Sequence, residues 1–269
     1  MGLRIQNNVE AFNTHRQLSA TGVAASKSME KLSSGYRINR AGDDAAGLAI
    51  SEKLRGQIGG LTQASRNASD AVSMVQTAEG ALNEVHSMLQ RVRELAVQFK
   101  NGSLSTQDRA AIQTEVNQLA SEIERIGSSA EFNGIKVLNG AVMLTFQVGA
   151  NDSDAVAVST ISLGAAIGAG VFALSSTQNT DLQDIDSAIN AVSSQRSTFG
   201  AVQNRFEHLM NGLSVYHENL VASESRIRDV DMAEEMVTMT KFQILQQAGT
   251  SMLAQANQLP QSVLSLLRG

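Results

Sequence analysis

The clearest pattern in this chain is a seven-residue repeat of apolar side chains between residues 61 and 99. Two series lie three positions apart, as the a and d positions of a heptad do. They consist of Leu61, Ala68, Val75, Leu82, Leu89 and Ala96, and of Ala64, Ala71, Ala78, Val85, Val92 and Phe99. This pattern predicts one helix of about 60 Å at a rise of 1.5 Å per residue, which Asn101-Gly102 should end.

Two further helices follow from the same kind of pattern. Residues 105–127 begin with Ser105 and Asp108 at capping-box spacing, and we expect Gly127 to end this helix. A third helix is predicted from about residue 182, because apolar residues again recur every seven positions. They are Ile185, Val192, Phe199, Phe206, Leu213, Leu220 and Ile227. We expect the two long helices to pack antiparallel, with the helix over 105–127 completing the bundle.

Between residues 131 and 181 the period changes from that of a helix to that of a strand. Two Asn-Gly pairs, at 133–134 and 139–140, are strong signals for hairpin turns. Apolar and polar residues alternate at 144–148 and 156–158, which predicts short strands. The predicted fold is therefore mainly α: a long antiparallel helical coiled-coil bundle with a small β-hairpin region in the middle and paired N- and C-termini.

Both ends of the chain carry apolar stripes at helical spacing but few charges. At the start, Ile5, Val9 and Phe12 mark one face, and Leu18 and Leu32 belong to a series that recurs every seven residues. The stripe at the end contains Leu245, Met252 and Leu259. Residues 236–269 hold only Lys241 and Arg268 as charges, and a lone helix of this kind is marginal in water. Residues 1–60 are mainly basic and residues 217–235 mainly acidic. We therefore expect the termini to require partners, with complementary charges at the two ends.

Composition excludes several classes of protein. The chain has 269 residues, 21 Lys plus Arg, 26 Asp plus Glu and a net charge of −5, which argues against nucleic-acid binding. It has no Cys, so a disulfide scaffold, a thiolate metal site and a cysteine nucleophile are excluded. The N-terminus lacks the apolar region of a cleaved secretion signal. Residues 155–174 are uncharged but rich in Ala, Gly, Ser and Thr, and we expect no membrane insertion.

No pattern indicates an enzyme or a cofactor. The four His are scattered without metal-ligand spacing, and no phosphate-binding loop or nucleophile elbow is present. Asp43-Asp44 resembles a Mg²⁺ carboxylate pair, but an acidic pair in a turn or at a helix start explains it without chemistry. We expect the latter, with no catalytic residue, cofactor or metal.

The segment QRVRELAVQ (90–98) is a candidate contact surface. Val92 and Ala96 occupy heptad positions, so the residues between them should face outward; these are Arg91, Glu94, Leu95 and Gln98. An outward Leu between charged side chains fits a surface that binds a partner.

Several long motifs resemble bacterial flagellins. They are SSGYRINRAGDDAAGLAISEKLRGQI (33–58), QTAEGALNEVHSMLQRVRELAVQ, EFNGIKVLNG, FQVGAND and RIRDVDMAEEMVTMTKFQILQQAGTSMLAQANQLPQSVLSLLRG. The resemblance covers roughly residues 1–152 and 182–269. On this ground the chain is identified as a member of the flagellin family, in a short form without large outer domains.

The resemblance implies a domain organisation. Residues 1–44 and 235–269 would pair as the coiled-coil core domain of a filament, disordered in the free monomer. Residues 45–180 and 181–234 would form a rod-shaped domain, with the β-hairpin region at 131–180. Filament assembly would use the terminal stripes: Ile5, Val9, Phe12, Leu18, Leu32, Leu245, Met252 and Leu259.

The resemblance also implies partners and a location. The chain would be secreted through the flagellar type III apparatus, held by a flagellin-specific chaperone, and polymerise with copies of itself beside hook-associated and cap proteins. Toll-like receptor 5 of a host would read Arg91, Leu95 and Glu115. Three alternatives remain: a hook–filament junction protein, a cytoplasmic coiled-coil adaptor, and a glycan-processing enzyme on this scaffold, for which residues 131–181 are too few to hold a catalytic domain.

Overall fold

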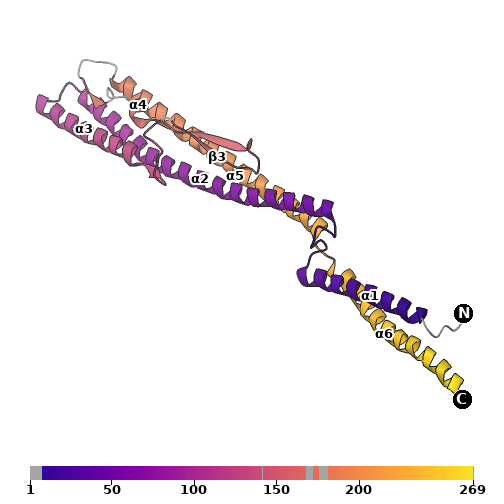
Figure 1. The fold of residues 1–269 in the computed structure, drawn as a ribbon. Helices are drawn as coiled ribbons and strands as arrows, with labels where there is room; N and C mark the ends of the chain where they lie inside the picture. Colours follow the sequence, from indigo (N-terminus) through magenta and orange to yellow (C-terminus); the bar gives the residue numbers. More distant parts are fainter. Residues whose placement is uncertain (1–7, 141, 168–171, 176–180, 269) are drawn as a thin grey trace. The chain divides into compact units, whose positions relative to one another are not determined.

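The computed structural model describes residues 8–140, 142–167, 172–175 and 181–268, without the side chains of 259–268. The elements, in chain order, are α1 (Val9–Ser34), α2 (Ala45–Phe99), α3 (Thr106–Ser129), β1 (Glu131–Phe132), β2 (Ile135–Lys136), β3 (Met143–Gln147), β4 (Ala155–Ser159), α4 (Leu163–Ile167), α5 (Asp181–Arg228) and α6 (Met232–Arg268) (Figure 1). The expected fold class, long helices with a small β region, is confirmed.

The chain divides into two compact units. The terminal unit comprises residues 1–56 and 220–269, and the middle unit comprises residues 57–219. Both α2 and α5 continue from one unit into the other.

The heptad pattern of α2 forms the core of the middle unit. Every a and d residue of the predicted repeat is buried, and Phe99, at 8% exposed, is the least so. Ile185, Val192, Phe199 and Phe206 of α5 and Val116 of α3 join the same cluster. Each large apolar side chain buried in this way stabilises the fold by about 1.5–3 kcal/mol relative to its exposed state.

Polar contacts fix the direction in which α2 and α5 pack. Arg93 of α2 pairs with Asp186, Gln203 donates to Glu79, and Ser69 donates to Met210. Residue numbers rise along one helix as they fall along the other, so the pair is antiparallel, as the sequence predicted. The capping box at the start of α3 is also confirmed, since Ser105 accepts from the Asp108 amide and Asp108 from the Ser105 amide.

Of the two predicted Asn-Gly hairpins, one is confirmed and one is wrong. Asn133 and Gly134 have φ of 51° and 76° and join β1 to β2. In contrast, the strands on either side of Asn139-Gly140, β2 and β3, belong to different sheets, and Asn139 forms an isolated bridge with Ser162. The second hairpin, between β3 and β4, turns elsewhere, at residues 148–154.

Gly127 does not end α3, contrary to the sequence prediction. The helix continues to Ser129, and Gly127 is buried against Leu163, whose Cδ2 would lie 3.2 Å from an added Cβ. This glycine therefore allows α4 to pack closely on α3.

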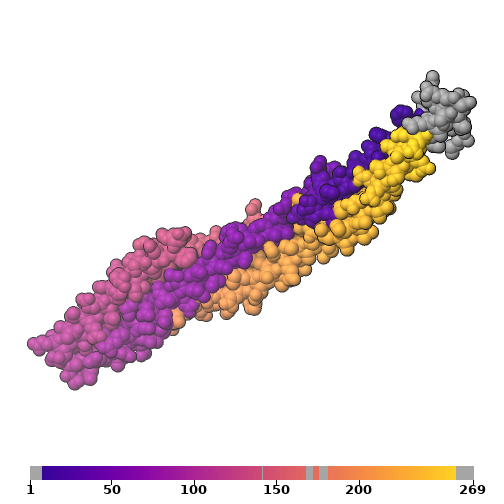
Figure 2. Space-filling model, turned by 90° about the horizontal axis from the view of Figure 1, so that it is seen from below, coloured from indigo at the N-terminus to yellow at the C-terminus, as the bar shows by residue number. Residues whose placement is uncertain are grey.

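In the terminal unit, α1 and α6 lie side by side (Figure 2). Asn8 Nδ2 donates to the Ala256 carbonyl at 2.7 Å, and Lys31 lies 3.5 Å from Glu235. The predicted pairing of the termini is confirmed. No described helix is long and apolar enough to cross a bilayer.

Candidate assembly and recognition surfaces

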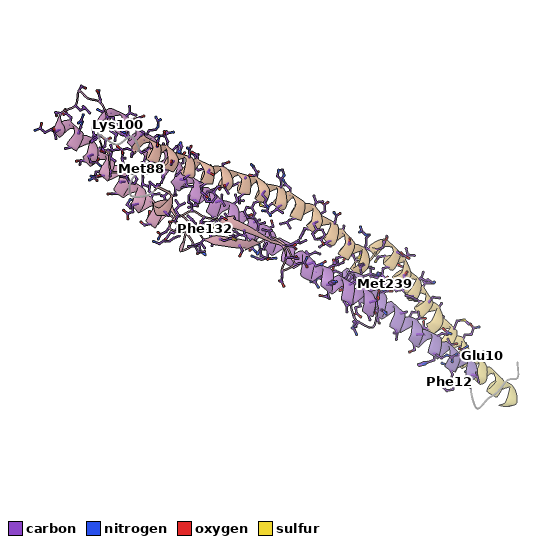
Figure 3. All side chains as sticks on the ribbon, turned by 90° about the horizontal axis from the view of Figure 1, so that it is seen from above. Glu10, Phe12, Met88, Lys100, Phe132 and Met239 are labelled. Carbon is purple, nitrogen blue, oxygen red and sulfur yellow. The ribbon has the colours of Figure 1, made fainter. Side chains whose placement is uncertain are left out.

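The exposed apolar side chains of the terminal unit form the first candidate surface. On α1, Val9 is 63% exposed and Phe12 is 71% exposed. Figure 3 shows where Phe12 lies on this helix. On α6, Leu245 and Met252 are 45% and 58% exposed. We call one stretch of this helix the α6 groove; it is lined by Met236, Val237, Thr240, Lys241, Ile244 and Leu245. Apolar side chains gathered in this way on long surface helices are typical of an interaction surface.

Other residues predicted for assembly have different surroundings. Leu18 and Leu32 are half-buried on α1. Leu18 lies against α6, because its Cδ1 would be 3.1 Å from a Cβ added at Gly249. Ile5 and the side chain of Leu259 lie outside the described residues.

The RAGDDAAG segment forms a turn that starts α2. Asp43 lies 2.7 Å from Lys27 and accepts from the amides of Asn39 and Arg40. The hydrogen bond from Lys27, followed by the one from Arg40, lowers the pKa of Asp43 to about 2. Asp44 accepts from the Gly47 amide at 2.8 Å in the manner of a helix N-cap. The expectation of an acidic pair at a turn and a helix start is confirmed.

A short two-segment junction, which the sequence did not predict, joins the ends of α1 and α5. Gly35 ends α1 with φ of 75°. Next to it, Tyr36 forms an antiparallel bridge with Asp229. Arg228 lies 4.8 Å from the Tyr36 ring centroid and 2.7 Å from Glu52, and its hydrogen bond lowers the pKa of Glu52. These contacts join residues far apart in sequence, so no local pattern could have revealed them.

The candidate recognition surface on α2 and α3 differs from the prediction at one residue. Arg91 is exposed and lies 2.9 Å from Glu115 and 3.2 Å from Glu94, and these bonds raise its pKa. Leu95, predicted to face outward, is only 2% exposed. The prediction considered one apolar seam on α2, but α3 covers a second side of the helix, where Leu95 belongs to the core.

The described residues hold no cluster of three or more His, Cys, Asp or Glu able to bind a metal ion. The two surfaces described above differ in chemistry: the terminal unit has exposed apolar side chains, and the middle unit has paired exposed charges.

Comparison with known proteins gives one consistent result. The family model described as the bacterial flagellin N-terminal helical region matches residues 5–143, and that of the C-terminal helical region matches residues 182–267. The chain is 50% identical to a flagellin of Bacillus subtilis, over 99% of this chain and 100% of that protein. It is 53% identical to a flagellin of Halalkalibacterium halodurans, over 98% and 99%.

A solved structure agrees with these sequence matches. The crystal structure of Bacillus cereus flagellin is similar with a TM-score of 0.51 and 28% identity, over 55% of this chain and 88% of that one. Two family regions at the two ends, with near-complete alignment to curated relatives, leave no other assignment: this chain belongs to the bacterial flagellin family.

Proposed function

We propose that this chain is the structural subunit of a bacterial flagellar filament and serves motility. The observation that best supports this proposal is that apolar side chains are buried in one unit and exposed in the other. The middle unit buries its heptad residues within one chain, whereas the terminal unit leaves large apolar side chains such as Phe12 and Val237 exposed. A second copy can remove that surface from water, at about 25 cal/mol for each Å² of apolar area buried.

In this proposal the chain has the two domains implied by its family resemblance. Residues 1–44 and 235–269 form the core domain of the filament, and residues 45–180 and 181–234 form the rod-shaped domain. Contacts between different surfaces of successive copies give an open helical polymer. Val9, Phe12, Leu245 and Met252 become buried on assembly, Leu18 and Leu32 hold the helix pair together, and Ile5 and Leu259 extend the two stripes.

The proposal includes the route to the filament. The subunit is secreted through the flagellar export apparatus with a flagellin-specific chaperone bound, and it assembles beside hook-associated and cap proteins. Family membership supports this route, as does the apolar, almost uncharged α6, which requires protection before assembly.

Recognition by Toll-like receptor 5 is proposed for the surface on α2 and α3. Arg91 and Glu115 are exposed there and accessible to a receptor. Leu95 is buried and supports recognition indirectly, because it belongs to the core that holds α3 against α2. Arg91→Ala should weaken receptor signalling by purified monomer, and Leu95→Ala should weaken it only to the extent that it destabilises the fold. Full signalling by Arg91→Ala would contradict this role.

The decisive experiment for the filament role is seeded assembly. Purified monomer is added to short filament fragments and examined by electron microscopy, beside a variant lacking residues 236–269 and an Arg91→Ala control. Long filaments from the intact chain and the control, and none from the truncated variant, are expected. If the intact chain remains a discrete soluble oligomer, it is a hook–filament junction protein or an adaptor instead.

A further inference from the structure

Methionines gather at the end of the terminal helix pair where α1 ends and α6 begins. Four of the ten methionines in the chain lie there: Met29 on α1, and Met232, Met236 and Met239 on α6. Met29, Met232 and Met236 are 56%, 49% and 48% exposed, and Met239 is half-buried. We call these four residues the methionine band.

The methionine band is compact. The two helices run antiparallel, and Lys31 of α1 lies 3.5 Å from Glu235 of α6. Met29 is therefore level with Met236 to within about one residue along the axis. The three methionines of α6 follow one another at spacings of four and three residues, which places them within about 60° around the axis of that helix.

The sulfur atoms of the band are more accessible than those of the methionines in the core. Met74 is 2% exposed, and Met88 and Met210 pack against the core cluster of the middle unit. An accessible thioether reacts with peroxides, and burial slows this reaction. Because the chain has no Cys, thioethers are its only sulfur groups. Three members of the band are therefore open to an oxidant in the single chain.

Oxidation changes this apolar surface into a polar one. A hydroperoxide transfers one oxygen atom to the thioether sulfur, which becomes a sulfoxide; when the oxidant is hydrogen peroxide, it leaves as water. Met236 lines the α6 groove together with Val237 and Ile244. A polar group that is buried at such a surface costs free energy unless it finds a hydrogen-bond donor. A filament that buries the band would thus form less readily from oxidised subunits.

We propose that the methionine band is a reversible oxidation site that controls assembly. A hydroperoxide oxidises the band in the free subunit, and the sulfoxides block incorporation, whereas subunits already in the filament have the band buried and are protected. Methionine sulfoxide reductases restore the thioether, as two thiols become a disulfide and the oxygen leaves as water. The inference rests on the proposed filament function and adds to it a chemical control of the surface that assembles.

Oxidation rates of single methionines test the protection. Monomer and filaments, each with free methionine added as an internal reference, are exposed to hydrogen peroxide, and peptide mass spectrometry measures the sulfoxide at each position. In monomer, Met29, Met232 and Met236 should oxidise at least about fivefold faster than Met74. In filaments, their rates relative to free methionine should fall at least about tenfold. Equal rates in monomer and filament would overturn the proposal.

Replacement by leucine tests which methionines control assembly. Leucine has a similar volume and is not oxidised by peroxide. Peroxide should raise the critical concentration for assembly of wild type at least about tenfold, and that of a fourfold variant by less than about twofold. The fourfold variant combines Met29→Leu, Met232→Leu, Met236→Leu and Met239→Leu. Each oxidised variant is compared with its own untreated sample, so a change in basal assembly cancels.

Met143→Leu is the matched control. Met143 is 66% exposed on β3, more than any member of the band, but it lies in the middle unit. This variant should remain as sensitive to peroxide as wild type, because its methionine band is intact. Resistance of Met143→Leu equal to that of the fourfold variant would overturn the role of the band.

Repair of oxidised wild type tests the site without mutation. Oxidised subunits are treated with dithiothreitol and the two methionine sulfoxide reductases, each of which reduces one sulfoxide epimer. Their critical concentration should return to within about twofold of the untreated value. Dithiothreitol alone is the control and should restore nothing.

The outcomes separate the oxidation site from the function. The oxidation site is wrong, and the filament function stands, if oxidised wild type assembles as well as untreated wild type, if the fourfold variant is as sensitive as wild type, or if repair does not restore assembly. If untreated wild type forms no filaments from seeds, the filament function and the oxidation site both fail.

Discussion

The two units of this molecule share one sequence pattern and differ in what a single chain can bury. In the middle unit, α2 is covered by α3, α5 and the β region, and its heptad residues are almost completely inaccessible. In the terminal unit, α1 packs mainly on α6, and the buried apolar residues described there are Ile38 and Ala256. An apolar repeat thus predicts a helix and which of its sides is buried. Whether a single chain can bury that side depends on how many other helices pack against it.

The largest expected effect is on the stability of the middle unit. Phe206 is 0% exposed and packs edge-on against Phe146, with ring centroids 6.1 Å apart. Phe206→Ala should lower the free energy of unfolding of the monomer by about 3–5 kcal/mol, because it removes buried contacts and leaves a cavity. Urea unfolding followed by circular dichroism measures this. A loss below about 1 kcal/mol would show that the core tolerates the cavity.

Phe12 offers the opposite case in the terminal unit. It is 71% exposed, so Phe12→Ala should change the unfolding free energy of the monomer by less than about 0.5 kcal/mol. In assembly, the variant lacks a large apolar side chain that the filament would bury. The critical concentration for assembly, measured by sedimentation, should therefore rise about tenfold. Equal losses of monomer stability in Phe12→Ala and Phe206→Ala would remove the distinction between the units.

The sequence predicted the features that depend on residues close together in the chain and missed those that depend on distant residues. Spacing alone located the buried face of α2, the capping box at Ser105 and the turn at Asn133-Gly134, because each depends on residues close in sequence. Leu95 was assigned to the wrong side, because its burial depends on α3, a separate helix. The contacts of Tyr36 with Asp229 and Arg228 cross some 190 residues of chain and carry no local pattern.

Two glycines, one in each unit, differ in the space that an added Cβ would have. A Cβ on Gly47 would lie 2.4 Å from Asp44 Oδ2 and 2.8 Å from Ile38 Cδ1, so Gly47→Ala should destabilise the chain by about 1–3 kcal/mol. Gly80 has open space around it within α2, and Gly80→Ala should instead stabilise by about 0.5–1 kcal/mol. Melting temperatures of the two variants should move in opposite directions, and a shared direction would contradict this packing.

The capping box tests local structure in the middle unit. Ser105→Ala removes the acceptor for the Asp108 amide and the partner that lowers the pKa of Asp108, and it should cost about 1 kcal/mol. Ser103→Ala is a matched control two residues away, and it should cost less than about 0.5 kcal/mol. Chemical denaturation of both variants would decide the point; equal values would mean that the cap contributes nothing.

The smallest expected effect concerns the acid behaviour of the turn before α2. Since the pKa of Asp43 falls from 3.8 to about 2 on folding, the folded chain binds this proton less readily than the unfolded chain. Its contribution to stability is therefore fully present above about pH 4 and is lost as the pH falls to about 2. The difference in unfolding free energy between wild type and Asp43→Asn should be constant near neutral pH and shrink across this window. In a Lys27→Met background, which removes the largest cause of the shift, the difference should already be smaller at pH 7. A difference that stays unchanged down to pH 2, or is unaffected by Lys27→Met, would mean that the Lys27–Asp43 pair does not hold the turn.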